Sequence, residues 1–515
     1  MKHSLTITIV AALSMCGMAQ AATRATMALT ADIRSTNPGV DRDDNTDGVI
    51  LNIVEGLVGY GEGGDVKPLL ARSIVVSDNG LTYTFKLRSG VRFHNGEELT
   101  SADVIWTWDR YLNPKTGWRC LADFDGRNGP KLLSVEAPDQ ETVVMHIDHP
   151  DALFLDTMAR TDCGMTAILN KASIKPDGSW DRPIGTGPYR LVEWKRGRSI
   201  TLERFDAYQS PPGTGFDGYV GLKTPRVDEI EFQVVPDPAT IKMAMSSKAL
   251  DIAQALSSDV KDLQADTNLV VFPVPDSSKN VLLFQTKDPL LGDRKLRQAI
   301  AAALDYVQLV EAASDGLSHP NNSSVFQGSV YFDAVQREGF RTDIAAAQKL
   351  LRDSSYKGQT IKMIANKRSP MPSFQVAVVT QAMLQAVGIN VEIEVLDWAT
   401  QLDRYNSGNY QMMSFSYSAR LDPALSYEQF AGDKAKQPRK VWDDPQALAL
   451  IERAKQVSDP SDRGKIFDAL HQMALNDAPL LMLYNGLTVW VCNKRVSDFK
   501  PWEGKPRLWN MRVDG

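Results

Sequence analysis

Hydrophobic and polar residues alternate with period two in several short stretches of the chain, as they do in half-buried strands. The clearest stretches are residues 81–87 and residues 143–147. Between them, Thr100 is expected to begin a helix, because it can act as the N-cap and Asp103 follows three residues later. The apolar residues of this helix fall on one face: Val104, Trp108 and Tyr111.

The strongest helical period in the sequence runs from Lys295 to Leu309. Asp293 is a credible N-cap, and apolar residues recur every four positions along one stripe. These residues are Leu296, Ile300 and Leu304. The pattern predicts one continuous helix with a buried face.

Beyond residue 360 the pattern alternates between strands and helices in the order βαβαβ. The predicted elements are strands at 361–364, 391–395 and 412–417, a helix at 374–387 closed by Gly388, and a helix at 398–405 capped by Asp397. Such alternation favours a mostly parallel sheet with helices on both faces. Because ligands of these sheets lie beyond the carboxyl ends of the strands, the loop after residue 417 is a candidate site.

The first 21 residues have the three parts of a secretory signal peptide. A basic start is followed by an apolar run at residues 5–13 and by the small residues Ala19 and Ala21, so we expect cleavage before Ala22. The apolar run is too short to span a bilayer. The alternative is an amphipathic helix buried at the N-terminus.

Composition and charge narrow the possible functions. Losing Lys2 with the signal takes the formal charge from −6 to −7, and removing 21 of the 515 residues leaves 494, enough for two or three lobes. No basic stripe suggests nucleic-acid binding, and no later window has eighteen consecutive apolar residues. Met15 stands before Cys16, where a lipoprotein signal would have a small residue, which argues against lipid anchoring.

Three cysteines remain after cleavage, in a protein expected to meet an oxidising compartment. Cys120 and Cys163 flank a compact segment, and a bridge between them would stabilise the fold by about 4 kcal/mol through chain entropy. The alternative is three unpaired thiols. Cys492 lies in an apolar run and is expected to be a buried thiol.

The sequence shows no motif for catalysis, cofactors or metals. It has no phosphate-binding loop and no G-x-S-x-G elbow. His146 and His149 stand three apart on a strand, so they point to opposite faces and are poorly placed to share a metal. This absence weighs against an enzyme, and we expect no cofactor.

Residues 69–114, LLARSIVVSDNGLTYTFKLRSGVRFHNGEELTSADVIWTWDRYLNP, resemble the signature region of the family 5 extracellular solute-binding proteins. These are the peptide, nickel and opine receptors of ATP-driven importers. Further blocks resemble the same family in order: Ile184–Leu191, Pro225–Pro236 with Ala249–Ala253, and Asp293–Asp305, where Leu296 replaces the usual valine. Most of these residues set turns and core helices, so they identify the fold and not the cargo.

The resemblance implies an α/β fold of two lobes, a type II periplasmic binding protein with three subdomains and with mixed sheets flanked by helices. Ligand would be enclosed between the lobes, and closure would be read by the membrane permease. The expected parts are lobe I at 22–67, 190–278 and 486–515, a subdomain inserted in it at 68–189, and lobe II at 279–485.

The loop from Ser414 to Pro423 should bear on ligand choice. Peptide-binding members of the family place an aspartate here, before a D-P or E-P pair, to hold the peptide's amino terminus. In this chain the position holds Ala419, or Arg420 with one gap, and neither can pair with an ammonium group. Arg420 points instead to a ligand with a carboxylate or similar anion; its alternative is to pair with a neighbouring acid such as Asp422.

Three other residues are candidate ligand contacts, each with a packing alternative. Tyr417 could stack on cargo or be a core tyrosine at the strand end, and Trp398 could touch ligand or pack at a helix start. Asp422 could accept an amine, although its place before Pro423 favours a turn.

The sequence therefore predicts the periplasmic substrate-binding component of an ABC transporter. Its cargo would be an oligopeptide or peptide-like solute, with opines, conjugated sugars and metal chelates as alternatives. Its partners would be an inner-membrane permease and the ATPase of that permease, and the chain itself would be a monomer without enzyme activity. An exported hydrolase, or a carrier that doubles as a folding helper or sensory partner, are the competing classes.

Overall fold

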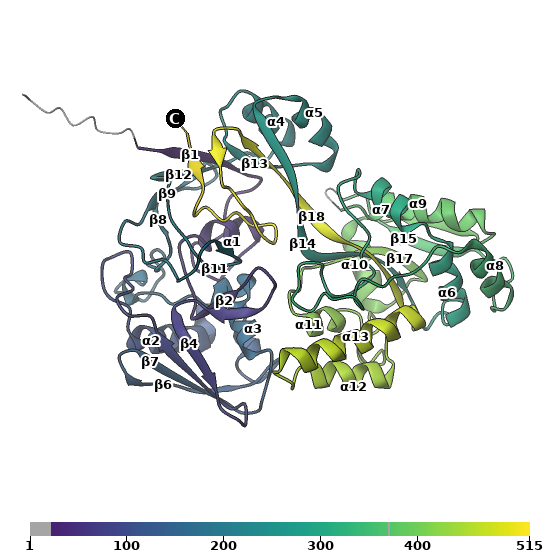
Figure 1. Cartoon of the computed structure of the whole chain (residues 1–515), viewed down its shortest axis with the longest axis horizontal. Coiled ribbons are helices and arrows are strands. Elements are labelled where there is room, and N and C mark those ends of the chain that lie inside the picture. The colour runs from purple at the N-terminus through teal and green to yellow at the C-terminus, as the bar shows by residue number, and fades with distance from the viewer. Residues whose placement is uncertain (1–21, 369–370, 515) are drawn as a thin grey trace, which may run out of the picture.

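Two lobes joined by a pair of long strands make up the protein (Figure 1). A computed structural model describes residues 22–368 and 371–514. The joining strands are β14 (Leu269–Phe284) and β18 (Leu480–Asn493), which pair antiparallel along most of their length. They belong to a ten-stranded sheet of order β16-β15-β17-β14-β18-β13-β1-β12-β9-β8, which therefore passes through both lobes. The predicted signal peptide lies outside the described residues.

One end of the large sheet forms what we call lobe I. Strand β1 pairs in parallel with both β12 and β13, and the antiparallel strands β9 and β8 extend the sheet beyond β12. Its strands are β1 (Arg24–Leu29), β8 (Tyr189–Lys195), β9 (Ser199–Arg204), β12 (Glu229–Val234) and β13 (Ile252–Ala255). Its helices are α1 (Asp44–Ile50), α4 (Pro238–Ser246) and α5 (Val260–Ala265). Short strand pairs complete it: β2 (Val58–Tyr60) with β3 (Val66–Pro68), β10 (Phe216–Asp217) with β11 (Val220–Gly221), and β19 (Val496–Ser497) with β20 (Arg512–Val513).

A separate four-stranded antiparallel sheet forms the inserted subdomain, with order β4-β5-β7-β6. Its elements are β4 (Ala71–Val76), β5 (Thr82–Leu87), α2 (Ser101–Leu112), β6 (Leu132–Asp139), β7 (Thr142–Ile147) and α3 (Phe154–Ala159). Both predicted strands and the predicted helix are confirmed. Thr100 and Asp103 form the expected capping box, and the face of α2 predicted as apolar is fully buried.

Lobe II carries the predicted βαβαβ order. Its strands are β15 (Ile361–Ala365), β16 (Val391–Val395) and β17 (Met412–Tyr417). Its helices are α6 (Arg294–Ala303), α7 (Tyr306–Ala313), α8 (Ile344–Arg352), α9 (Ser373–Ala386), α10 (Trp398–Ser407), α11 (Pro423–Glu428), α12 (Pro445–Ala454) and α13 (Pro460–Asp477). The α9 and α10 predictions are confirmed, with Asp397 capping α10 and Gly388 left-handed beyond α9.

The three strands of the βαβαβ region are parallel, as predicted, and the ten-stranded sheet as a whole is mixed. Only β15 and its neighbours β16 and β17 are parallel in lobe II, because β17 then pairs antiparallel with β14. The two long strands return the chain between lobes, and this long-range pairing leaves no local sequence signal. The predicted lobe boundaries at 278/279 and 485/486 fall inside these strands, and the division into parts at those residues remains a proposal.

The single helix predicted from Lys295 to Leu309 is wrong. The structure has two helices, because the backbone becomes extended at Leu304 and Asp305 caps a second helix by accepting from the Gln308 amide. The periodic residues 296, 300 and 304 are nonetheless fully buried, so the apolar stripe was identified correctly. A period of four can continue into a two-residue break when the residues on it face the same core.

A disulfide joins Cys120 to Cys163 in the inserted subdomain, with the two Cα atoms 5.6 Å apart. Cys492 is a free, buried thiol, and burial raises its pKa to about 12. We expect the intact mass of unreduced protein to be about 2 Da below that of reduced protein, because one bridge removes two hydrogens. Equal masses before and after reduction would contradict the bridge.

No helix of the described residues is long and apolar enough to cross a membrane.

A buried ion pair lies in the core of lobe I. Lys223 Nζ contacts Glu55 Oε1 at 2.8 Å, with both side chains almost completely buried. Glu55 also accepts hydrogen bonds from Tyr208 and Thr186, so this ion pair ties together distant segments of the chain.

Candidate functional site

The loop after β17 lies where the two lobes meet. It runs from Ser418 to Asp422 and leads into helix α11. Leu421 packs against the core shared by lobe I and the inserted subdomain. Nearby, the Val330 amide of lobe II donates to Gly63 O of the β2–β3 turn at 3.0 Å. Residues of this loop therefore face groups from both lobes.

Arg420 has a cationic side chain without an acidic partner. Its Nη1 donates to Ala419 O of its own loop at 2.7 Å, and no carboxylate of the described residues lies within 4.0 Å. Burial lowers the pKa of Arg420, and Arg160 and Arg119 add to this effect, whereas Asp162 opposes it. The guanidinium thus lies among charged groups of the inserted subdomain, where an additional anion would be favourable.

The acids that face Arg420 are already paired. Arg160 holds Asp162 with two hydrogen bonds, at 3.0 and 2.9 Å, and reaches Asp123 at 2.8 Å; Arg119 lies 3.3 Å from Asp162. Burial opposes ionisation of Asp162, but Arg160, with help from Arg119 and Arg420, holds its pKa at about 2. Three arginines therefore face two aspartates, which leaves one excess positive charge.

Tyr417 and Trp398 pack together with other aromatic residues of lobe II. Tyr417 is buried, and its ring centre lies 5.3 Å from that of Phe415. Trp398 stacks on the same Phe415 at 5.9 Å, and the Arg368 guanidinium lies 5.4 Å from the Trp398 ring centre. The aromatic packing fills the carboxyl end of β17, which positions the loop that follows.

Both carboxylate oxygens of Asp422 are engaged. One accepts from the Ala424 amide at 2.8 Å and caps α11. The other lies 2.8 Å from Arg463 Nη2 with both side chains buried, in an ion pair whose angle is not that of a hydrogen bond. The structure thus gives Asp422 the capping role that the Asp-Pro sequence favours, and Arg420 does not pair with it.

The family model for bacterial extracellular solute-binding proteins, family 5, matches residues 65–437. The chain belongs to this family. It is 26% identical over 453 residues to the oligopeptide-binding protein AppA of Bacillus subtilis, covering 82% of this chain and 78% of AppA. The structure of HbpA2 from Haemophilus parasuis has a TM-score of 0.82, with 20% identity and coverage of 96% and 100%. The PBP AgaA from A. tumefaciens R10, in complex with agropinic acid, has a TM-score of 0.69, 25% identity and coverage of 96% and 99%.

As a family 5 solute-binding protein, the chain has the two-lobed periplasmic-binding fold predicted from its sequence, and that prediction is confirmed. The proteins of this family bind solutes outside the cytoplasm. The motifs at 69–114 and 184–191 contribute to the fold. In the second motif, Gly185 and Gly187 lie so close to Ile53 that a side chain on either glycine would collide with the Ile53 backbone.

Sequence reasoning missed a second group of charged residues where the lobes join. Lys279 and Asp276 lie in β14, and Glu503 lies in the C-terminal segment, 226 residues from the Ser277 that it contacts. In the β-ladder Lys279 stands opposite Tyr417, directly before the Arg420 loop. The run Asp-Ser-Ser-Lys inside an apolar strand was a signal for these residues of β14, but no local pattern could place Glu503 beside it.

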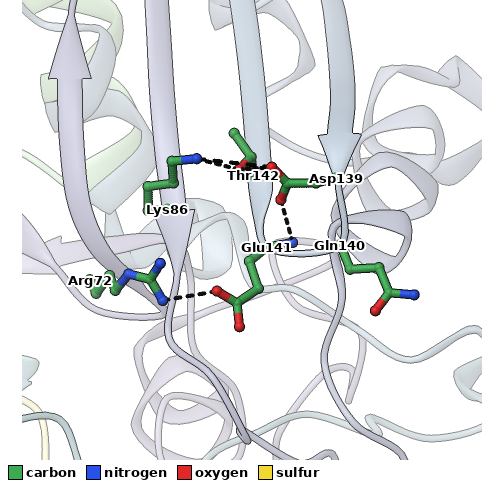
Figure 2. Close-up of a pocket in the computed structure, with 6 residues that line it drawn as sticks. All are labelled: Arg72, Lys86, Asp139, Gln140, Glu141 and Thr142. Atoms are coloured by element: carbon green, nitrogen blue, oxygen red, sulfur yellow. Dashed lines mark hydrogen bonds and ion pairs between the residues drawn. The ribbon is translucent and has the colours of Figure 1, made fainter.

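A hollow lies elsewhere, at the turn between β6 and β7, with a volume of about 510 Å³. Figure 2 shows its charged side chains paired with neighbours in the lining, whereas Gln140 makes no such contact among the residues drawn. Arg72 contacts Glu141 at 3.0 Å, and Lys86 donates to Thr142 at 2.7 Å beside Asp139. Because these groups are exposed and mutually satisfied, this surface offers no charge directed at a ligand.

Proposed function

We propose that this protein is the periplasmic substrate-binding component of an ABC transporter. It captures an oligopeptide or peptide-like solute between its two lobes and delivers it to the permease, which is driven by its own ATPase. It performs no reaction of its own and works as a monomer. Cleavage before Ala22 releases it from its export signal, two residues before β1 begins.

The observation that carries this proposal is Arg420. A partly buried guanidinium on a loop between the lobes, with no carboxylate of the described residues within 4.0 Å, favours a ligand with an anionic group. The carboxyl terminus of a peptide supplies such a group. Alanine at residue 419 cannot pair with an ammonium group, which argues against the usual capture of a peptide's amine at this loop.

The relatives support a carboxylate-bearing cargo. AppA is named for oligopeptides, and AgaA is in complex with agropinic acid. An opine is therefore the second candidate ligand, and Arg420 suits it for the same reason. Conjugated sugars and metal chelates lack an observation in their favour.

A thermal-shift screen of peptides, opines, sugars and metal chelates tests the proposal. A bound solute should stabilise the folded state by about 2.7 kcal/mol at a hundredfold excess over its Kd. Native mass spectrometry of freshly purified protein should detect cargo, and mass spectrometry of the incubated solute should find it unchanged. Stabilisation only by solutes without an anionic group, or conversion of the solute to a product, would contradict the proposal.

A further inference from the structure

Four charged side chains gather where the lobes join, and none has an oppositely charged atom within 4.0 Å among the described residues. They are Asp276, Lys279, Arg420 and Glu503. Other buried cations are paired, such as Lys223 with Glu55 at 2.8 Å and Arg297 with Asp477 at 2.9 Å, whereas Asp156 and Lys440 are, like Lys279, buried without an ion pair in the described part of the chain. Lys279 is buried and the other three are partly buried, and because an unpaired charge removed from water is costly, four of them at one place point to a ligand that completes the cluster.

The strands widen at this junction. The pairing of β14 with β18 shifts register between Pro275 and Lys279, where the two strands pass from one lobe to the other. Gly486 of β18 has no side chain there, and a Cβ on it would lie 2.9 Å from Asp276 Oδ1. The irregular pairing and the glycine together make room for the charged side chains of β14.

Lys279 is the most deeply buried member of the cluster, with 2% of its surface exposed. Its Nζ makes one hydrogen bond, to Ser277 O at 2.8 Å, and so two of its three N–H groups remain for another acceptor. Its neighbour in the β17 ladder is Tyr417, three residues before Arg420. The two cations therefore flank the same end of β17.

Glu503 provides the opposite charge from lobe I. Its Oε2 accepts from the amide and the hydroxyl of Ser277, at 2.9 and 2.7 Å, whereas its Oε1 has no hydrogen-bond partner among the described residues. Glu503 and Gly504 both have positive φ, at 49° and 72°, in the tight turn that aims this carboxyl group at β14. Asp276, whose Oδ1 accepts from the Ser278 amide, stands next to it.

The electrostatics agree with this geometry. Burial lowers the pKa of Lys279 to about 7, and Arg420 adds to that effect, while Glu503 and Asp276 oppose it. Burial raises the pKa of Glu503 to about 7, and Asp276 adds to the rise, while Ser277 and Lys505 oppose it. Each group would regain its charged form if an opposite charge were placed beside it.

We propose that this cluster is a site for the two opposite charges of a zwitterionic solute. Arg420 and Lys279 receive the carboxylate, and Glu503 with Asp276 receives the ammonium group. The amine of a peptide is thus held by acids at the strand junction, in place of the acid that residue 419 lacks. This inference rests on the proposed function and specifies its substrate class.

Calorimetry with four forms of trialanine tests the site: free, C-terminally amidated, N-acetylated and blocked at both ends. In the wild type, each block should weaken binding about tenfold or more, since a hydrogen bond to a charged group is lost. Lys279→Met should weaken binding of the free peptide and reduce the acid-to-amide ratio of affinities about tenfold. Glu503→Gln should weaken binding of the free peptide and reduce about tenfold the ratio of its affinity to that of the N-acetylated peptide. Lys436→Met, at a side chain 83% exposed, is the control.

The pH dependence gives a second readout that a merely structural role would not produce. Between pH 5.5 and 7 trialanine keeps both charges, while Glu503 ionises as its pKa of about 7 is approached. Affinity of the wild type should therefore rise on the order of tenfold over this range. Glu503→Gln should remove the rise, and Lys279→Met should keep it.

The outcomes separate this inference from the proposed function. If Arg420→Ala abolishes trialanine binding while the Lys279 and Glu503 variants keep both ratios of the wild type, the proposed function stands and the zwitterion site is wrong. Absence of trialanine binding at millimolar concentration also overturns the zwitterion site, and the thermal-shift screen then decides the proposed function alone. If native mass spectrometry of the purified protein detects a cargo without an amine, the zwitterion site is likewise overturned. Thermal unfolding of each variant shows whether it is folded.

Discussion

Replacing Arg420 by alanine is expected to weaken binding of a carboxylate-bearing solute on the order of a hundredfold. The guanidinium has no acidic partner within 4.0 Å among the residues that the structure describes, and it lies between the lobes, so its loss should remove a charge-assisted, two-pronged contact with the ligand. Calorimetry with the solute that gives the largest thermal shift measures the change. The unfolding temperature without ligand should stay close to that of the wild type, because the side chain bonds only to its own loop.

Arg420→Lys is the matched comparison. Lysine keeps the positive charge but not the planar pair of donors, so it should recover only part of the affinity. Arg127→Ala serves as a control, since this arginine lies on the exposed surface of the inserted subdomain and pairs with Asp125. Unchanged affinity in Arg420→Ala would remove Arg420 from the site and, with it, the argument for an anionic ligand.

Replacing Lys223 by methionine is expected to lower the free energy of unfolding by about 3–5 kcal/mol. Methionine fills a similar volume but leaves the Glu55 carboxylate, 1% exposed, with only the hydroxyls of Tyr208 and Thr186 as donors. The ammonium group also lies 4.9 Å from the centre of the Trp509 ring, a contact that is lost as well. Denaturant unfolding followed by fluorescence measures the effect.

The double variant Lys223→Met with Glu55→Gln should recover a large part of this loss. It removes the unpaired charge while the amide still accepts from Tyr208, so the two substitutions should be strongly non-additive. Lys465→Met, at a side chain 72% exposed, should change stability by less than about 1 kcal/mol. Additive losses in the double variant would show that Lys223 acts through packing and not through its charge.

Local patterns predicted the local structure well. Strand β17 and helix α10 were placed from alternation, helical period and the capping residue Asp397, all of which depend on neighbours in sequence. The break between α6 and α7 was missed because both sides of it bury residues of the same stripe. Burial alone did not distinguish one helix from two, and the second cap, Asp305, was the signal overlooked.

Some residues of the candidate site could likewise be predicted from the sequence, and others could not. Arg420 could be predicted as a site residue because a single residue type at one position of a loop carries its chemistry with it. Lys279 and Glu503 were not found, because their importance depends on contacts between segments more than two hundred residues apart. The packing roles of Tyr417 and Asp422 likewise became visible only with their neighbours Phe415 and Arg463.

By itself the amino-acid sequence determined the elements of each lobe, the family, and the departure at residues 419 and 420 from the family's acidic position. Hydrophobic period, caps and turns act over a few residues, so they can be read along the chain. Only the tertiary structure decided that β14 and β18 join the lobes and that four charges meet there without an ion pair among residues 22–368 and 371–514. Electrostatic energy depends on distance in space and on burial, and neither is encoded in any short stretch of the chain.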